Sequence, residues 1–260
     1  MENPDLITLL ALFMLALVAG AIDAMAGGGG LLTVPGLLAT GMDPISALGT
    51  NKLQGCFGTA AATFRFWRHK RLVLSEHLVG IGATLAGALA GAVAVFFISP
   101  HHLRTLIPFL LIAIALWLLC QPRLGDVARK ARLSPLAYSL TMLPLIGFYD
   151  GFLGPGTGSF YALSAVALLG LSLEEATARA KLFNFTSNLA PTLYFALQGK
   201  VVWLYAAAMV PGMILGGTLG AHLVLRHGAR LVRPMLVVMS LAMSAKLLWD
   251  QGLFTAILKP

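Results

Sequence analysis

Long apolar runs constrain the fold of this chain more than any other feature. Several of them approach the ~20 residues that a helix needs to cross a bilayer. Only 11% of the residues are charged, against about 25% in soluble domains. The sequence therefore predicts an all-α, polytopic membrane protein. The runs cover residues 6–22, 78–98, 105–120, 136–149, 201–225 and 235–249.

The first apolar run resembles a signal peptide only in its length. A signal peptide begins with a cationic region, whereas the residues before this run include Glu2 and Asp5 and neither Lys nor Arg. We therefore expect the segment to be retained as the first helix.

The formal net charge of +8 comes from basic residues in short loops between the apolar runs, over 65–71, 123–132 and 226–233. Loops of this kind set the orientation of a membrane protein, with the basic side in the cytoplasm. We therefore expect the three loops to be cytoplasmic and both termini periplasmic, and we do not expect a nucleic-acid partner.

The chain matches itself at an offset of 126 to 130 residues. The first match aligns Asp23 with Asp150, and the second aligns Lys52 with Lys181. Such ordered self-similarity indicates structural repeats, here a repeat over 1–122, a linker loop over 123–134 and a second repeat over 135–260. The matched segments are 19–30 with 146–158, 40–55 with 169–184, 80–91 with 210–221 and 103–111 with 229–237.

Each repeat is expected to hold five elements, which are about four spanning helices and one short segment that is broken or re-entrant. The odd number makes the two repeats inverted. Inverted repeats with broken segments are typical of secondary transporters, whose site lies near the midplane of the membrane. The expected elements are 6–25, 28–40, 44–66, 78–98 and 104–121 in the first repeat, and 136–152, 156–169, 173–197, 201–225 and 232–252 in the second.

The short segments follow glycine-rich breaks, although each glycine in a helix costs roughly 1 kcal/mol relative to alanine. Irregular backbone at membrane depth is tolerated where it lines a cavity. Glycine there lets backbone N–H groups and the positive end of the next helix approach an anion. We therefore expect a central anion site with two walls, one of Gly27, Gly28, Gly29 and Gly30 and the other of Gly154, Pro155, Gly156, Thr157 and Gly158.

Lys52 and Lys181 lie within the semi-polar helices that follow the two short segments. A buried lysine is costly in a membrane and usually faces a cavity, so both are candidates for pairing with the anion. The alternatives are snorkelling to an interface or a structural ion pair with Asp23 or Asp150. Nearby amides and a hydroxyl could bond the anion or join helices, and these are Asn51, Gln54, Asn184, Ser187 and Asn188.

Asp23 and Asp150 each lie one turn before a glycine break. They could accept a coupling proton, because burial favours the neutral carboxyl group. They could instead brace the break by accepting backbone N–H bonds. We favour the structural role, since a carboxylate beside an anion site repels the substrate unless it is protonated or paired.

No catalytic constellation is visible. The histidines lie mostly at loops or span ends without metal-ligand spacing, and "GPGTG" lacks the G-K-[ST] of a phosphate loop. We therefore expect no enzyme activity, no metal and no cofactor.

Three stretches of the chain resemble the TauE/SafE sulfite-exporter family, also called the toluene-sulfonate uptake permease family, and especially its YfcA-type branch. They are "AGAIDAMAGGGGLLTVPGLLATGMDPISALGTNKLQ", "GFYDGFLGPGTGSFYAL" with "ATARAKLFNFTSNLAP", and "RPMLVVMSLAMSAKLL". The resemblance implies a bacterial inner-membrane transporter of two inverted halves. It also implies a substrate among sulfite, sulfonates, sulfoacetate and other small organic anions.

We expect a secondary transporter, an exporter of such an anion that works by alternating access. A passive anion channel and a cation or proton-coupled carrier using Asp23 and Asp150 as ligands are the alternatives. The expected partners are the anionic substrate and the lipid bilayer, with a coupling proton and a second copy of the chain as further candidates.

Overall fold

The computed structural model describes residues 5–103, 106, 107, 109, 113 and 130–227. These residues form helices and connecting turns, and none of them is in a strand. The prediction of an all-α protein is confirmed for this part of the chain. The spans expected over 104–121 and 232–252 lie largely outside the described residues.

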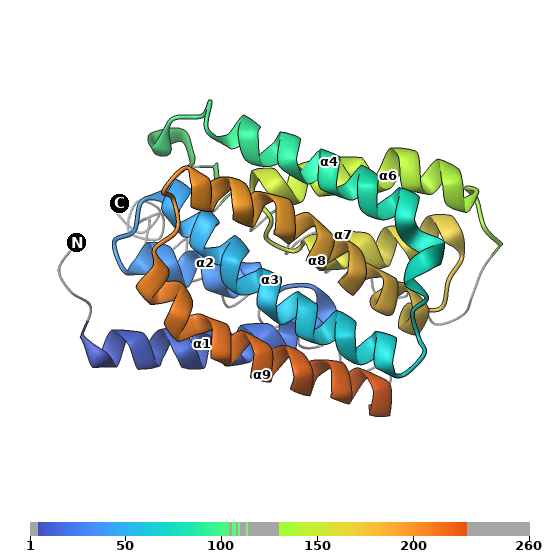
Figure 1. Ribbon diagram of the computed structural model, residues 1–260, viewed down its shortest axis with the longest axis horizontal. Helices are drawn as coiled ribbons and strands as arrows, with labels where there is room; N and C mark the ends of the chain where they lie inside the picture. Colours follow the sequence, from blue (N-terminus) through green and yellow to red (C-terminus); the bar gives the residue numbers. More distant parts are fainter. Residues whose placement is uncertain (1–4, 104–105, 108, 110–112, 114–129, 228–260) are drawn as a thin grey trace, which may run out of the picture.

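The long helices run side by side along the longest axis of the molecule (Figure 1). Three helical segments, Leu6–Ala26, Leu74–Val95 and Trp203–Arg226, are long and apolar enough to cross a membrane. The elements are α1 (Leu6–Ala26), α2 (Gly30–Ala39), α3 (Pro44–Arg68), the 3-10 turn η1 (Leu74–His77), α4 (Leu78–Val95), α6 (Pro135–Phe152), α7 (Thr157–Ser164), the π-helical segment η2 (Ala165–Leu169), α8 (Leu173–Leu197) and α9 (Trp203–His227).

Capping residues fix where the two central helices begin. The Asp43 carboxylate accepts a hydrogen bond from the N–H of Ser46 at 3.1 Å, and proline occupies the next position. Ser172 and Glu175 form a reciprocal capping box at the start of α8. Both patterns satisfy N–H groups that the first turn of a helix leaves free, so these helices start where the sequence predicts.

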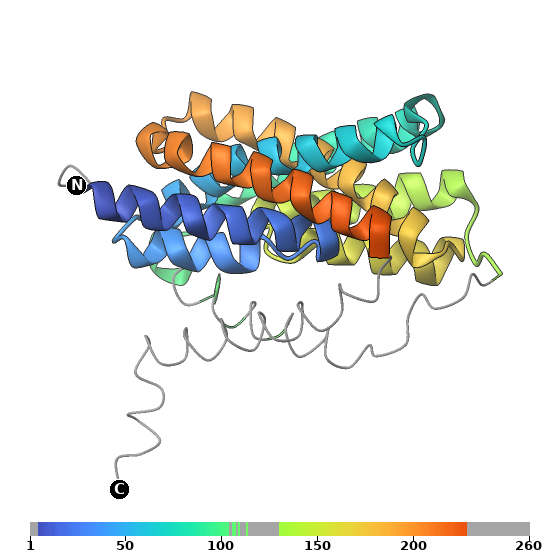
Figure 2. The same ribbon diagram turned by 90° about the horizontal axis from the view of Figure 1, so that it is seen from below.

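Rows of small residues let α1 lie directly against α9, and both views show the two helices side by side (Figures 1 and 2). A Cβ added to Gly212, Gly216 or Gly220 would overlap the backbone of α1. Close approach of this kind drives helix association in lipid. These glycines therefore serve packing, and because their contacts move along α1 and α9 in the same direction, the two helices are parallel.

The pair α4 and α6 packs in the same way. A Cβ on Gly87 would overlap the backbone of Pro144 in α6, and a Cβ on Gly91 would overlap that of Phe148. The two helices are therefore parallel. Gly82 of the same helix has nothing within 4 Å of an added Cβ and faces outward. The reason is that its side of α4 is not covered by a described helix.

The central helices α3 and α8 cross the molecule in opposite directions. Gly49, near the start of α3, approaches Phe195 near the end of α8, and Gly55 approaches Asn188 about two turns earlier in α8. Helix α9 runs parallel to α3, because Thr50 contacts the N–H of Val202 at 3.0 Å at one end and Arg65 contacts His222 at 2.8 Å at the other.

Polarity is distributed opposite to that of a soluble protein. Large apolar side chains on the outer helices are exposed, with Leu140 at 57% and Leu193 at 61% of their accessible area. Charged side chains lie inside, with Lys52 and Lys181 each only 1% exposed. Such a molecule is stable when its outer surface contacts lipid. The buried polar centre is therefore the candidate region for a functional site.

Candidate functional site

The two glycine-rich breaks meet at the centre of the molecule. Gly27 ends α1 with a positive φ of 78°, and Gly154 turns the chain after α6 with a φ of 90°. A Cβ on Gly27 would overlap the backbone of Gly158, so the two breaks touch. The Ser159 hydroxyl donates to the carbonyl of Ala26 at 2.6 Å and joins the breaks further.

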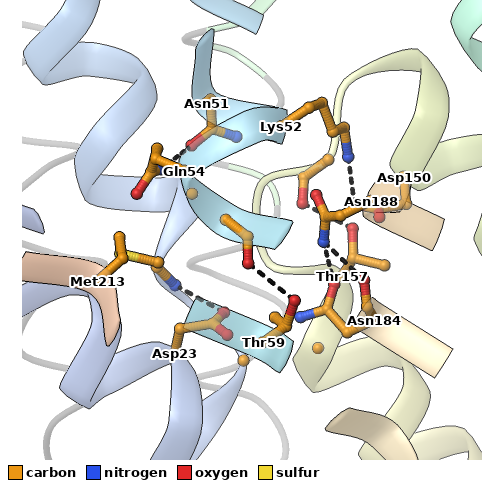
Figure 3. Close-up of a pocket in the computed structure, with 16 residues that line it drawn as sticks. Asp23, Asn51, Lys52, Gln54, Thr59, Asp150, Thr157, Asn184, Asn188 and Met213 are labelled. Carbon is orange, nitrogen blue, oxygen red and sulfur yellow. Dashed lines mark hydrogen bonds and ion pairs between the residues drawn. The ribbon is translucent and has the colours of Figure 1, made fainter. Parts of the chain in front are cut away.

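A small hollow of about 30 Å³ lies where the breaks meet (Figure 3). Its walls come from both breaks, from α3 and α8, and from one residue of α9. The lining residues are Asp23, Gly27, Gly29, Gly30, Asn51, Lys52, Gln54, Gly55, Thr59, Asp150, Gly154, Thr157, Gly158, Asn184, Asn188 and Met213.

An ion pair between Lys52 and Asp150 forms part of the wall. The Lys52 Nζ lies 2.8 Å from Asp150 Oδ1, and both side chains are almost completely buried. An ammonium group has three N–H donors, and this pair uses one of them. The second carboxylate oxygen of Asp150 has no hydrogen-bond partner among the described residues.

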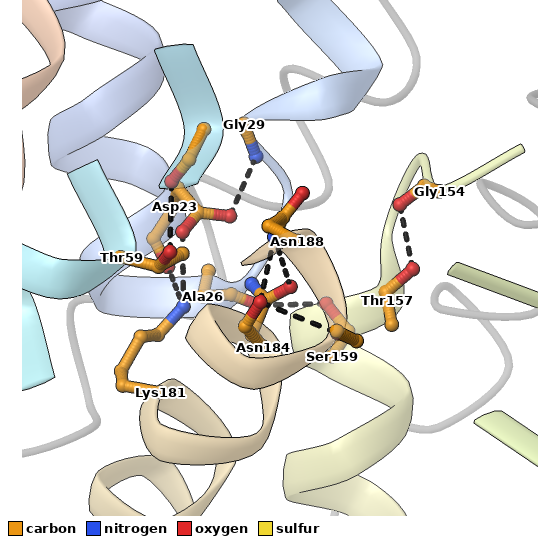
Figure 4. A network of polar contacts seen from close by, with 12 residues as sticks. Asp23, Ala26, Gly29, Thr59, Gly154, Thr157, Ser159, Lys181, Asn184 and Asn188 are labelled. Atoms are coloured by element: carbon orange, nitrogen blue, oxygen red, sulfur yellow. Dashed lines mark hydrogen bonds and ion pairs between the residues drawn. The ribbon is translucent and has the colours of Figure 1, made fainter. Parts of the chain in front are cut away.

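The second ion pair, between Lys181 and Asp23, has different surroundings (Figure 4). The Lys181 Nζ lies 3.3 Å from Asp23 Oδ2 and also donates to the backbone carbonyl of Asp23. The other carboxylate oxygen accepts the N–H of Gly29 at 3.2 Å. These contacts are those of a residue that braces the first break.

Two amide side chains keep free donors beside the hollow. The Asn51 oxygen accepts hydrogen bonds from the Thr33 hydroxyl at 2.5 Å and from Gln54 Nε2 at 2.8 Å, which directs its NH₂ group elsewhere. The Asn184 oxygen accepts from Asn188 Nδ2 at 3.1 Å. Neither NH₂ group has a hydrogen bond within the described residues, so both can donate to a bound anion.

The structure brings together most of the residues that the sequence singled out. Gly28, Pro155, Gly156 and Lys181 do not line the hollow, and Lys181 lies behind Gly158. The Ser187 hydroxyl bonds within its own helix, to the carbonyl of Asn184 at 3.2 Å.

Three lining residues were not expected, namely Gly55, Thr59 and Met213. Gly55 and Thr59 follow Asn51 at helical spacings of four and eight residues, so the face of α3 that carries Asn51 could have indicated them. Met213 enters from α9, and its contribution depends on tertiary packing alone.

No group of three or more metal-ligating side chains occurs among residues 5–103 and 130–227. The hollow instead combines ion pairs, amides and helix N-termini in an apolar shell. That arrangement offers a cation and N–H donors to a small anion.

Comparison with known proteins assigns the family. The model of the sulfite exporter TauE/SafE family matches residues 12–247. The chain is 48% identical to the "Probable membrane transporter protein YfcA" of Escherichia coli K12 over 92% of this chain and 89% of the relative. It is 47% identical to a "Probable membrane transporter protein" of Haemophilus influenzae, over 94% and 95%, and 43% identical to ORF9 of Sinorhizobium, over 92% of each. No solved structure matches significantly.

The chain therefore belongs to the TauE/SafE family and is a bacterial membrane transporter.

Proposed function

We propose that the protein is a secondary transporter that exports small organic or sulfur-containing anions, such as sulfite, sulfonates or sulfoacetate. One observation carries the proposal. At the meeting point of the two breaks, the ammonium group of Lys52 and the NH₂ groups of Asn51 and Asn184 border one hollow with donors that no described residue uses. The first N–H groups of α2 and α7 border it as well, and a helix N-terminus favours an anion.

Two inverted halves, 1–122 and 135–260 joined by the loop 123–134, explain several features together. Under the sequence match, α1, α3 and α9 correspond to α6, α8 and α4. In each group of three, one helix comes from the other half of the chain. Helix α9 of the second half packs on α1 of the first, and α4 of the first half packs on α6 of the second. The ion pairs cross in the same way, Lys52 to Asp150 and Lys181 to Asp23.

Alternating access follows from this crossed arrangement. Lys52 lines the hollow, whereas its counterpart Lys181 is enclosed behind Gly158. If one half rocks against the other, the two lysines exchange these positions, and the anion is passed between them. Both lysines then contact substrate during one cycle, although at different stages.

A coupling proton is a second feature that the geometry favours. Asp150 has an unpartnered buried oxygen, while both oxygens of Asp23 are engaged. An added anion competes with Asp150 for Lys52, and a proton on Asp150 would relieve that competition. A cation carrier is disfavoured, because each carboxylate already has a lysine as its counterion.

Ligand binding to the purified protein distinguishes an anion site from a cation site. We expect sulfite, sulfoacetate or a related small anion to raise the melting temperature, since a ligand at 100 times its Kd stabilises by about 2.7 kcal/mol. Sodium ions at the same ionic strength should leave the melting temperature unchanged. Stabilisation by sodium and by none of the anions would contradict the anion site.

Counterflow in proteoliposomes distinguishes a carrier from a channel. Vesicles loaded with unlabelled sulfoacetate and diluted into labelled sulfoacetate should accumulate label transiently above its final value, because a carrier exchanges its substrate. A channel equilibrates the label without an overshoot. Protein-free vesicles provide the background.

The proposed orientation places both termini in the periplasm and the basic loops in the cytoplasm of a bacterial inner membrane. Support comes from the described part of the chain, where Arg65 of α3 contacts His222 of α9 and Arg71 pairs with Glu174 at 3.2 Å. Basic ends of several helices therefore lie at one end of the molecule. Rows of small residues would also allow a homodimer.

A further inference from the structure

A second hollow, separate from the central one, opens at the end of the molecule that carries Arg71. It has a volume of about 430 Å³ and lies between α4, α6, α8 and the segment formed by α7 and η2. We call it the vestibule, and it shares no lining residue with the central hollow. Its polar lining residues are Glu76, His77, Tyr138, Ser139, Tyr161 and Arg179.

Arg179 is a cation without a counterion in this vestibule. It is half-buried on α8, and no hydrogen bond or ion pair of its guanidinium group occurs within the described ranges. Glu174 of the same helix is paired with Arg71, and Glu76 is exposed at the mouth of the vestibule. A guanidinium group keeps its charge and offers five donors in a plane, so it attracts anions that have several oxygen atoms.

The surroundings of Tyr161 are an independent indication that the vestibule binds a polar ligand. Its side chain is 1% exposed and lines the vestibule. Its hydroxyl lies near the hydroxyl groups of Thr84 and Ser187 and within electrostatic range of Asp150, and no atom of the described residues meets hydrogen-bond geometry with it. The Thr84 hydroxyl and one Asp150 oxygen are unpartnered too. Buried polar atoms are normally satisfied, and a group of unsatisfied ones marks a place for water or ligand.

The same tyrosine lies between the two hollows. Its ring belongs to the wall of the vestibule, and its hydroxyl is near Asp150, which belongs to the wall of the central hollow. A movement of Tyr161 would therefore connect the two spaces.

We propose that the vestibule is the cytoplasmic access route of the transported anion, with Arg179 as its first binding group and Tyr161 as the gate to the central hollow. This inference rests on the proposed transport function and adds a second anion-binding position to it. The ligand class is a small organic or sulfur oxyanion. The side of the membrane follows from the basic loop over 65–71, which leads directly into η1 and the vestibule.

Thiol labelling tests the vestibule without requiring transport. In a Cys56→Ala/Cys120→Ala background, Ser139→Cys places one thiol on the vestibule wall. An anionic methanethiosulfonate reagent should react faster than its cationic analogue, because the Arg179 charge concentrates anions. We expect Arg179→Gln to lower the anionic-to-cationic rate ratio about tenfold and Arg179→Lys to restore most of it. Arg68→Gln, which removes an exposed charge at the end of α3, should leave the ratio unchanged.

Sulfoacetate protection tests binding at the same position. Sulfoacetate should slow the labelling of Ser139→Cys when Arg179 is present and should have no effect with Arg179→Gln. In proteoliposomes, Arg179→Gln should raise the KM for sulfoacetate supplied from the vestibule side at least fivefold and leave the KM from the opposite side unchanged. In the same background, with Thr157→Cys in place of Ser139→Cys as the thiol in the central hollow, Tyr161→Phe should leave this thiol protected from the reagents, whereas Tyr161→Ala should expose it to labelling.

The outcomes separate this inference from the transport proposal. Suppose that the protein transports the anion normally and that Arg179→Gln does not change the anionic-to-cationic labelling ratio. The proposed role of the vestibule would then be wrong, and the transport proposal would still hold. A responsive ratio with sulfoacetate protection, in a protein that transports none of the probes, would support the vestibule as an anion site and contradict the transport proposal.

Discussion

Replacing Lys52 with Met is expected to abolish sulfoacetate counterflow, with a loss of at least 100-fold in rate. The substitution removes the ammonium group that borders the central hollow and leaves Asp150 as a buried carboxylate without its counterion. Breaking a buried ion pair by removing one partner typically costs 3–5 kcal/mol. The single variant should therefore also melt at a lower temperature.

The double variant Lys52→Met/Asp150→Asn separates the two effects. It removes both charges together, so the desolvation penalty of the remaining partner disappears and the melting temperature should return close to that of the wild type. Transport should not return, because the donor that holds the anion is still missing. Recovery of rapid counterflow in the double variant would show that Lys52 is only the structural counterion of Asp150.

A surface ion pair provides the matched control. Arg71 and Glu174 lie 3.2 Å apart with side chains that are 55% and 37% exposed, and exposed pairs contribute only about 0–1 kcal/mol. Arg71→Met/Glu174→Gln makes the same kind of neutral exchange and should alter neither melting temperature nor counterflow. A lower melting temperature or slower counterflow in that control would indicate that the protein is generally sensitive to the removal of charges.

The helices could be predicted from the sequence because their boundaries depend on neighbouring residues. Proline after Asp43 and the Ser172–Glu175 box specify helix starts within a single turn, and the glycine tracts specify the breaks. The π-helical segment Ala165–Leu169 was not predicted. Its sequence, AVALL, suits an α-helix equally well, so the widened turn must be set by the surrounding packing.

The candidate site was predictable as a set of residues but not as a set of contacts. The sequence indicated that each lysine could pair with either aspartate, because pattern and charge give no distances. The structure selects the crossed pairs, which join residues 98 positions apart in one case and 158 in the other. That choice, the enclosure of Lys181 and the contribution of Met213 all depend on how α9 and the second half pack on the first.

Adding a single methyl group at Gly158 is expected to prevent the two breaks from meeting. Gly158 lies in α7, where alanine would ordinarily be favoured by about 1 kcal/mol over glycine. Its added Cβ would, however, overlap the Cα of Gly27 and lie 3.1 Å from both Asn184 Nδ2 and Lys181 Nζ. Backbone atoms cannot move aside as a flexible side chain can, so Gly158→Ala should lower the melting temperature strongly and abolish ligand stabilisation.

Gly82→Ala is the matched control, since this glycine is also helical and has nothing within 4 Å of an added Cβ. Helix propensity alone should make this substitution neutral or slightly stabilising. If Gly158→Ala lowers the melting temperature and Gly82→Ala does not, the loss of stability comes from the contact between the two breaks. A Gly158→Ala protein that is as stable as Gly82→Ala and still binds sulfoacetate would mean that the breaks do not touch in the membrane, and the anion site built on their contact would then be wrong.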